Sequence, residues 1–250
     1  DTSLSDGYID LVFEGHTHQG YRLQDEYGVY HLQNKGDNKG GISHVQIAIN
    51  CVTGDSSVRL AELVSTGKYK NLKDDPIVDQ LLEKYDDQIS YANENVGYNS
   101  SYRTGDELHQ IVADLYFDAG MKQWGESYDI VLGGGFIRVR SPYNLPAGDV
   151  TYGMLYSLFP FDNQLMLCSI KGRDLWDKFF NTSNEDYFIC YGDYGASVYD
   201  DIDMTATYYV VVDSYSAYYA RNNLTIIAEF DSKTFARDLL ADYVSAGGLA

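Results

Sequence analysis

The sequence predicts an α+β fold, or an α/β fold with a mixed sheet, because strand-like and helix-like segments mix without a regular βαβ repeat. Short apolar runs at 130–132 and 208–213 are typical of buried strands, whereas apolar residues recur at helical spacing between 106 and 119. The chain has 250 residues, of which 44% are hydrophobic and 14% aromatic. That is enough for one large or two ordinary domains with real cores.

The first part of the chain is predicted to consist mainly of strands. Segments 8–13, 29–32, 41–50 and 58–64 alternate partly between apolar and polar residues, which is the period of a half-buried strand. The sequence GHTHQGY, starting at Gly15, is expected to be the turn after the first strand. We expect this region to end near Lys70, as a first domain of residues 1–70.

A linker helix is expected within residues 71–95. Asp75 can cap its start, Pro76 suits the first helical position, and apolar residues follow at helical spacing as far as Ile89. The third region, residues 96–250, should open with a helix over 106–119. Thr104 and Glu107 have the spacing of a capping box, and Gly120 is expected to stop this helix.

The remaining elements follow in order. The run 130–132 is expected to be a strand that ends in a turn at Gly133-Gly134-Gly135, where glycine allows a sharp bend or a close approach to a ligand. Further strands are expected at 165–170, 208–213 and 224–228, with a short helix around 174–180 and a closing helix over 233–246.

The charge of the chain limits its partners. Eighteen Lys and Arg against 37 Asp and Glu give a net charge of −19, which repels polyanions and argues against nucleic acid as a partner. No apolar run approaches the roughly 20 residues of a membrane helix, and no signal segment opens the chain. Cys51, Cys168 and Cys190 show no metal spacing, and the latter two are expected to be buried free thiols.

Residues 129–163 combine features that suit a nucleotide ligand. Arg138 and Arg140 follow the glycines, and a guanidinium can hold a phosphate or carboxylate. Phe161 and Asn163 place an aromatic ring beside an amide, and such a ring can stack on a planar base.

In the same region, GGGFIR, GDVT and PFDN stand in the order found in the C-terminal domain of the 5'-nucleotidases and UDP-sugar hydrolases, and the chain resembles that family. The earlier GHTH is similar to the metal-binding turn that closes the family's calcineurin-like phosphoesterase domain. The resemblance covers most of the chain. It implies a substrate-binding domain at 96–250, preceded by the last strands of a metallophosphoesterase domain.

The resemblance also implies roles for single residues. Arg138 matches a phosphate- or carboxylate-contacting arginine, although Phe136 adds a residue before it and leaves Arg140 as a competitor. Six residues would bind substrate, through base stacking, base or phosphate contact or a nearby backbone position: Arg138, Phe161, Asn163, Tyr215, Arg103 and Gly192. His16 and His18 would ligate metal, as part of a site for two divalent ions such as Zn or Mn.

Two departures from the family pattern affect the expected activity. The family's other metal ligands are missing, and the chain starts in a strand-like segment without an initiator Met, so we expect a fragment that is inactive alone. Tyr219-Ala220-Arg221 stands where the family has Gly-Gly-Asp, which replaces a ribose-hydroxyl acceptor by a donor. An additional phosphate on the substrate is one hypothesis for the role of Arg221.

The leading interpretation is the C-terminal part of a secreted, periplasmic or surface-bound bacterial 5'-nucleotidase-like phosphoester hydrolase of nucleotide catabolism. Its partner would be a nucleotide or sugar nucleotide. One alternative keeps the fold but makes it a non-catalytic ligand-binding or surface-interaction domain, and another is a carbohydrate-binding module rich in exposed tyrosines.

Overall fold

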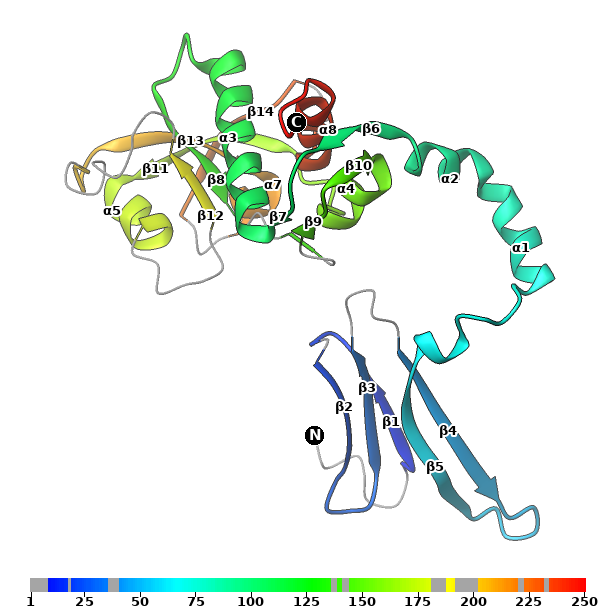
Figure 1. Ribbon diagram of the computed structural model, residues 1–250. Helices are drawn as coiled ribbons and strands as arrows, with labels where there is room; N and C mark the ends of the chain where they lie inside the picture. Colours follow the sequence, from blue (N-terminus) through cyan, green and yellow to red (C-terminus); the bar gives the residue numbers. More distant parts are fainter. Residues whose placement is uncertain are drawn as a thin grey trace. The chain divides into compact units, whose positions relative to one another are not determined.

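The computed structural model describes residues 9–17, 19–35, 41–135, 139–140, 144–180, 188–191, 202–219, 223–231 and 234–250. Contacts within the chain define two compact units, Asp1–Lys84 and Tyr85–Ala250 (Figure 1). Each unit is described by itself. Within the described residues, no helix has the length and apolar character needed to span a membrane.

The first unit consists of a small sheet and a long hairpin. The sheet has the order β1-β3-β2, with β1 (Leu11–Glu14) parallel and β2 (Gln19–Gln24) antiparallel to β3 (Tyr30–Lys35). The hairpin pairs β4 (Gly41–Ile49) with β5 (Ser56–Ser65), and a 3-10 turn, η2 (Thr66–Tyr69), follows. The strands expected at 41–50 and 58–64 are confirmed, whereas the expected turn after Gly15 was too long because β2 begins at Gln19.

The predicted helix after Asp75 begins as expected but is not continuous. The Asp75 carboxylate accepts a hydrogen bond from the backbone N–H of Ile77 at 2.8 Å, and Pro76 occupies the first turn of α1 (Pro76–Leu82). A 3-10 turn, η3 (Glu83–Tyr85), then separates α1 from α2 (Asp86–Ala92). Apolar side chains of α1 are exposed, Ile77 to 69%.

The second unit is built on a five-stranded sheet with the order β12-β8-β13-β11-β14 (Figure 1). Only β8 and β13 run parallel among these neighbours, so the mixed sheet and the α+β class are confirmed. The five strands are β12 (Phe188–Tyr191), β8 (Ile130–Gly135), β13 (Thr207–Asp213), β11 (Leu165–Lys171) and β14 (Thr225–Glu229). Two short pairs join β6 (Asn95–Asn99) to β10 (Gly148–Thr151) and β7 (Arg103–Thr104) to β9 (Asn144–Leu145).

Helices cover both faces of this sheet. They are α3 (Gly105–Trp124), α4 (Tyr152–Leu158), α5 (Gly172–Leu175) with the π-helical turn η4 (Trp176–Phe180), α7 (Ser214–Tyr218) and α8 (Ala236–Ser245). The predicted capping box is confirmed, since Thr104 Oγ1 accepts from the N–H of Glu107 and the Glu107 carboxylate accepts from the N–H of Thr104. The closing helix exists but starts later than the predicted residue 233.

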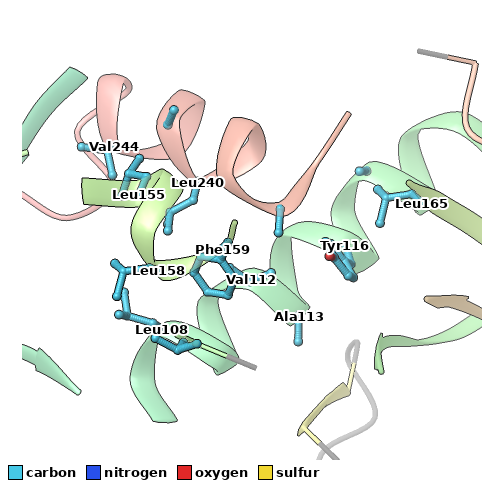
Figure 2. Close-up of a cluster of buried hydrophobic side chains, with 14 of the residues drawn as sticks. Leu108, Val112, Ala113, Tyr116, Leu155, Leu158, Phe159, Leu165, Leu240 and Val244 are labelled. Carbon is cyan, nitrogen blue, oxygen red and sulfur yellow. The ribbon is translucent and has the colours of Figure 1, made fainter. Parts of the chain in front are cut away.

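Alternation along the strands separates two hydrophobic cores. Leu165, Leu167 and Val211 belong to the core that α3, α4 and α8 cover, whereas Met166 and Cys168 belong to the core beside α5 and η4. Figure 2 shows the first core, where Leu108 and Val112 of α3 lie near Leu158 of α4. Cys168 is a buried free thiol, as predicted, and burial raises its pKa to about 12.

Two expectations about glycine are wrong, for a common reason. Gly120 does not end α3, and Gly133 to Gly135 do not form a turn but continue β8 between β12 and β13. A Cβ on Gly120 would lie 2.3 Å from Val211 Cγ2, and one on Gly133 would lie 2.5 Å from the backbone N of Phe117. These glycines provide the space that lets α3 lie directly on the sheet.

Candidate functional site

The loop that carries PFDN and the start of α7 meet at one end of two neighbouring strands. Leu165, the first residue of β11, is paired with Asp213, the last residue of β13. Beyond that pair, the N–H of Ser214 donates to the carbonyl of Gln164 at 2.7 Å, and the N–H of Gln164 donates to Ser214 Oγ at 3.1 Å. These reciprocal hydrogen bonds fix the two segments to each other.

Two exposed aromatic rings flank this junction. Phe161 in the PFDN loop is 51% exposed, and Tyr215 in α7 is 56% exposed. An exposed aromatic ring can stack on a planar base, so these two rings, carried by segments that are joined at one strand end, form a candidate stacking site. Asn163 lies half-buried in the same loop.

A buried arginine holds the PFDN loop in place. Arg237 in α8 is only 5% exposed, and its guanidinium donates to the carbonyls of Phe159 at 3.4 Å and Phe161 at 3.2 Å. It also forms an ion pair with the carboxylate of Asp162. The N–H groups of this one guanidinium therefore bind oxygen atoms of Phe159, Phe161 and Asp162, which holds the loop around Phe161.

The same guanidinium is enclosed by aromatic side chains. Its carbon atom lies 4.7 Å from the ring centroids of both Tyr156 and Phe235, which are cation–π distances. Its Nε donates to the hydroxyl of Tyr152 at 3.2 Å. Burial opposes the charge, but the hydrogen bond to Asp162 raises the pKa of Arg237 overall, so this arginine stays charged.

The segment after the glycines is anchored from two helices. The N–H of Val139 donates to Nε2 of the buried His109 at 2.7 Å, and the N–H of Arg140 donates to the carbonyl of Leu158 at 2.7 Å. With its backbone held in this way, Arg140 places its guanidinium carbon 4.9 Å from the ring centroid of Phe161. Arg140 therefore lies beside the candidate stacking ring.

The start of α7 is organised by a buried carboxylate. Asp213 is 1% exposed, accepts from the N–H of Ser216 at 2.9 Å and accepts from Ser216 Oγ at 2.9 Å. Burial raises the pKa of Asp213 to about 6, although these hydrogen bonds act in the opposite direction. Gly135 approaches so closely that a Cβ there would lie 2.4 Å from Ser216 Oγ.

The structure describes one of the remaining predicted substrate residues, Arg103. Arg103 lies in β7, and its Nε is buried without a hydrogen-bond acceptor among the residues that the structure describes. Such a donor is costly unless a ligand or water accepts from it. Arg138 and Gly192 lie outside the described residues, as does Arg221.

The predicted metal residues do not form a complete site. His16 is exposed in a left-handed backbone conformation (φ 74°), and His18 lies outside the described residues. In the described part of the chain, no three His, Cys, Asp or Glu side chains are grouped so that they could hold a metal ion. His31 instead contacts the carboxylates of Glu14 at 2.5 Å and Asp25 at 3.4 Å, and the Glu14 hydrogen bond raises its pKa.

The sequence matches a known family model over part of its length. The model of the 5'-nucleotidase C-terminal domain matches residues 88–193, which include the glycine strand and the PFDN loop. These residues, less than half of the chain, are similar to that domain family.

Solved structures of similar fold include two described as 5'-nucleotidases. A 5'-nucleotidase precursor from Thermus thermophilus is similar with a TM-score of 0.60 and 14% identity, over 95% of this chain and 56% of that one. A putative 5'-nucleotidase from Staphylococcus aureus, in complex with alpha-ketoglutarate, also has a TM-score of 0.60 and 14% identity, over 99% of this chain and 55% of that one. The chain thus spans about half the length of these structures.

A curated relative of this chain is Endonuclease YhcR of Bacillus subtilis (strain 168). It is 27% identical over 181 residues, which are 68% of this chain and 14% of that protein. The match therefore concerns a small part of a much longer protein.

Arg237 and His109 organise the site but are not among the residues predicted from the sequence. His109 resembles any helix histidine, because its acceptor role depends on Val139, which lies far along the chain. Arg237 did carry a signal. It stands in the first turn of α8, where the helix dipole disfavours a cation, so a compensating partner could have been expected there.

Proposed function

We propose that this chain is the substrate-binding part of a 5'-nucleotidase-type phosphoester hydrolase, and that it holds the base of a nucleotide between Phe161 and Tyr215. The junction of Gln164 and Ser214 carries this proposal, because it fixes both exposed rings at one strand end. The match of residues 88–193 to the 5'-nucleotidase C-terminal domain supports the hydrolase class, and a nucleotide or sugar nucleotide is proposed as the ligand.

The roles of the neighbouring residues follow from their chemistry. The amide of Asn163 can both donate to and accept from the edge of a base. Arg103 has a buried donor to offer a phosphate, and Arg138 is proposed as a second phosphate-binding arginine on sequence grounds. Gly192 is proposed, also from the sequence, to let the backbone approach the base.

We assign the chain the binding step alone. His16 and His18 are proposed to contribute to a site for two divalent metal ions, such as Zn or Mn, in a longer protein. The described residues do not complete such a site, so the chain alone is proposed to be inactive. Residues 1–70 are proposed to end a metallophosphoesterase domain, with 71–95 as linker and 96–250 as substrate domain, in a protein exported to the periplasm, the surface or the medium.

Isothermal titration calorimetry of the 250-residue chain with adenosine, uridine and AMP tests the proposal. Replacing either ring, in Phe161→Ala or Tyr215→Ala, should weaken nucleoside binding about 5- to 150-fold, since stacking contributes about 1 to 3 kcal/mol per base. Tyr98→Ala is the matched control, because Tyr98 lies in β6 and is 53% exposed.

The outcomes separate this proposal from its alternatives. Binding that neither ring substitution weakens would place the base elsewhere and contradict the proposed site. A folded chain that binds sugars but no nucleoside would favour a carbohydrate-binding module. A folded chain that binds neither would favour the surface-interaction alternative.

A further inference from the structure

The ring of Tyr215 is not isolated on the surface. The ring centroid of Tyr219 lies 6.1 Å from that of Tyr215, with an angle of 14° between the two planes. This is an offset stack, one of the favoured arrangements of two aromatic rings. One face of Tyr215 is therefore directed toward another ring, while more than half of the side chain stays accessible to solvent.

The backbone accounts for this stack. Tyr215 lies in the first turn of α7 and Tyr219 is its C-cap, four residues later, so both side chains leave the same side of the helix. The N–H of Tyr219 donates to the carbonyl of Tyr215 at 3.1 Å, which closes the turn that brings the rings together.

The neighbouring tyrosine shows that the stack depends on spacing. Tyr218 is one residue closer in sequence and is 65% exposed, but its hydroxyl points to Glu229, with an oxygen-to-oxygen distance of 3.5 Å. The aromatic character of the segment alone therefore does not produce the contact with Tyr215. Of these two tyrosines, the one four positions away makes it.

We propose that Tyr219 is a positioning residue that fixes the ring of Tyr215 as one wall of the nucleoside site. This inference rests on the proposed function. Tyr219 stands at the first position of the segment Tyr219-Ala220-Arg221, where the resemblance leads one to expect glycine. A glycine there has no side chain to support the ring, so this chain has a wall that is already oriented before the ligand arrives.

Phe161 also has a supporting neighbour. The guanidinium carbon of Arg140 lies 4.9 Å from its ring centroid, so each of the two exposed rings is in contact with another side chain. Loss of Tyr219 should remove the stacking contact and widen the range of side-chain orientations that the ring of Tyr215 samples. Binding would then have to order the ring again, which lowers affinity without removing any ligand contact.

The test uses the full chain and two measurements. Adenosine affinity is measured by calorimetry for Tyr219→Ala, Tyr219→Phe and the control Tyr218→Ala. Tyr219→Ala should weaken binding about threefold to tenfold, in the range of one aromatic pair, while Tyr219→Phe restores binding to within about twofold because it keeps the ring. Tyr218→Ala should bind like the parent chain.

The second measurement needs no ligand. In fluorotyrosine-labelled protein, the 19F NMR signal absent from Tyr215→Phe identifies Tyr215, and its line width and shift report the order of that ring. Tyr219→Ala should change this signal, whereas Tyr219→Phe and Tyr218→Ala should not. An unchanged Tyr215 signal in Tyr219→Ala overturns the inference, even if the chain binds no nucleoside.

Failure of the two proposals can be told apart. If the parent chain binds no adenosine but the Tyr215 signal depends on Tyr219, the proposed function fails while the positioning contact holds. If adenosine binds and depends on Tyr215, but Tyr219→Ala binds as tightly as the parent, the inference fails and the proposed function holds.

Discussion

The guanidinium of Arg237 pairs with the carboxylate of Asp162 although these residues lie in different helix and loop segments and the arginine is almost fully buried. The pair joins α8 to the loop that carries Phe161. A buried charge is stable only while its partners remain, so the position of Phe161 depends on a residue that is far away in sequence.

Arg237→Ala should therefore lower both stability and nucleoside affinity. We expect the free energy of unfolding to fall by about 3 kcal/mol, because the carbonyls of the loop lose their donors. Urea denaturation measures the stability. Arg173→Ala, at an exposed arginine of α5, is the control and should change it by less than about 0.5 kcal/mol. Equal effects of the two substitutions would contradict the proposed role.

Arg140→Ala should weaken adenosine and AMP binding to a similar extent, about two- to fivefold, because Arg140 supports the ring of Phe161. Arg138→Ala is expected to weaken AMP binding but to leave adenosine binding unchanged, since it is proposed to contact the phosphate. Calorimetry with both ligands checks this. An AMP-selective loss in Arg140→Ala would assign the phosphate to Arg140 instead.

Asp213→Asn should change how stability depends on pH. Burial raises the pKa of Asp213 to about 6 in the folded chain, above the usual value near 3.8, so the folded state favours the protonated acid. Its stabilising contribution is complete below about pH 4 and is lost as the pH rises through about 6, at a cost of about 3 kcal/mol. The charge of Asp213 contributes to raising the pKa values of the nearby Tyr116 and Cys168. Both values lie well above this pH range, so neither group titrates in it.

The measurement is the difference in unfolding free energy between Asp213→Asn and the parent chain, at pH 4 and at pH 7.5. Asparagine keeps an acceptor for the N–H of Ser216 and has no charge to bury. The variant should therefore gain stability relative to the parent as the pH rises. A difference that does not change with pH would show that folding does not raise the pKa of Asp213.

Gly120→Ala should destabilise the chain by about 1 to 3 kcal/mol, although alanine favours helix formation, because its Cβ would overlap Val211 Cγ2. Adding Val211→Ala should recover part of the loss relative to Val211→Ala alone. Asp118→Ala, on the exposed side of α3, is the control. Thermal unfolding of the four variants checks this, and a stabilising Gly120→Ala would disprove the packing role.

The sequence predicts elements whose signals are local. Thr104 and Glu107 form their capping box from neighbouring residues, and the apolar run of β13 is recognisable without its partners. The glycines were misread because their role depends on distant atoms, Val211 for Gly120 and Phe117 for Gly133.

Some residues of the candidate site could be predicted from the sequence, and others are seen only in the structure. The resemblance singles out Phe161 and Tyr215 as a ligand pair, and the structure places both exposed at one strand end. It does not reveal Arg237, because the Asp162 pair joins distant segments. The offset stack of Tyr219 on Tyr215 requires the short helix α7, which the sequence pattern did not predict.

The glycine triplet of β8 has a consequence for how such chains are recognised. Gly133 contacts the backbone of α3, and Gly135 faces Ser216, so the absence of side chains at both positions is a requirement of packing. A descendant that had lost its ligand would still need both glycines to fold. The triplet is therefore a marker of the fold, whereas the exposed rings proposed to bind the ligand can change without disturbing this packing.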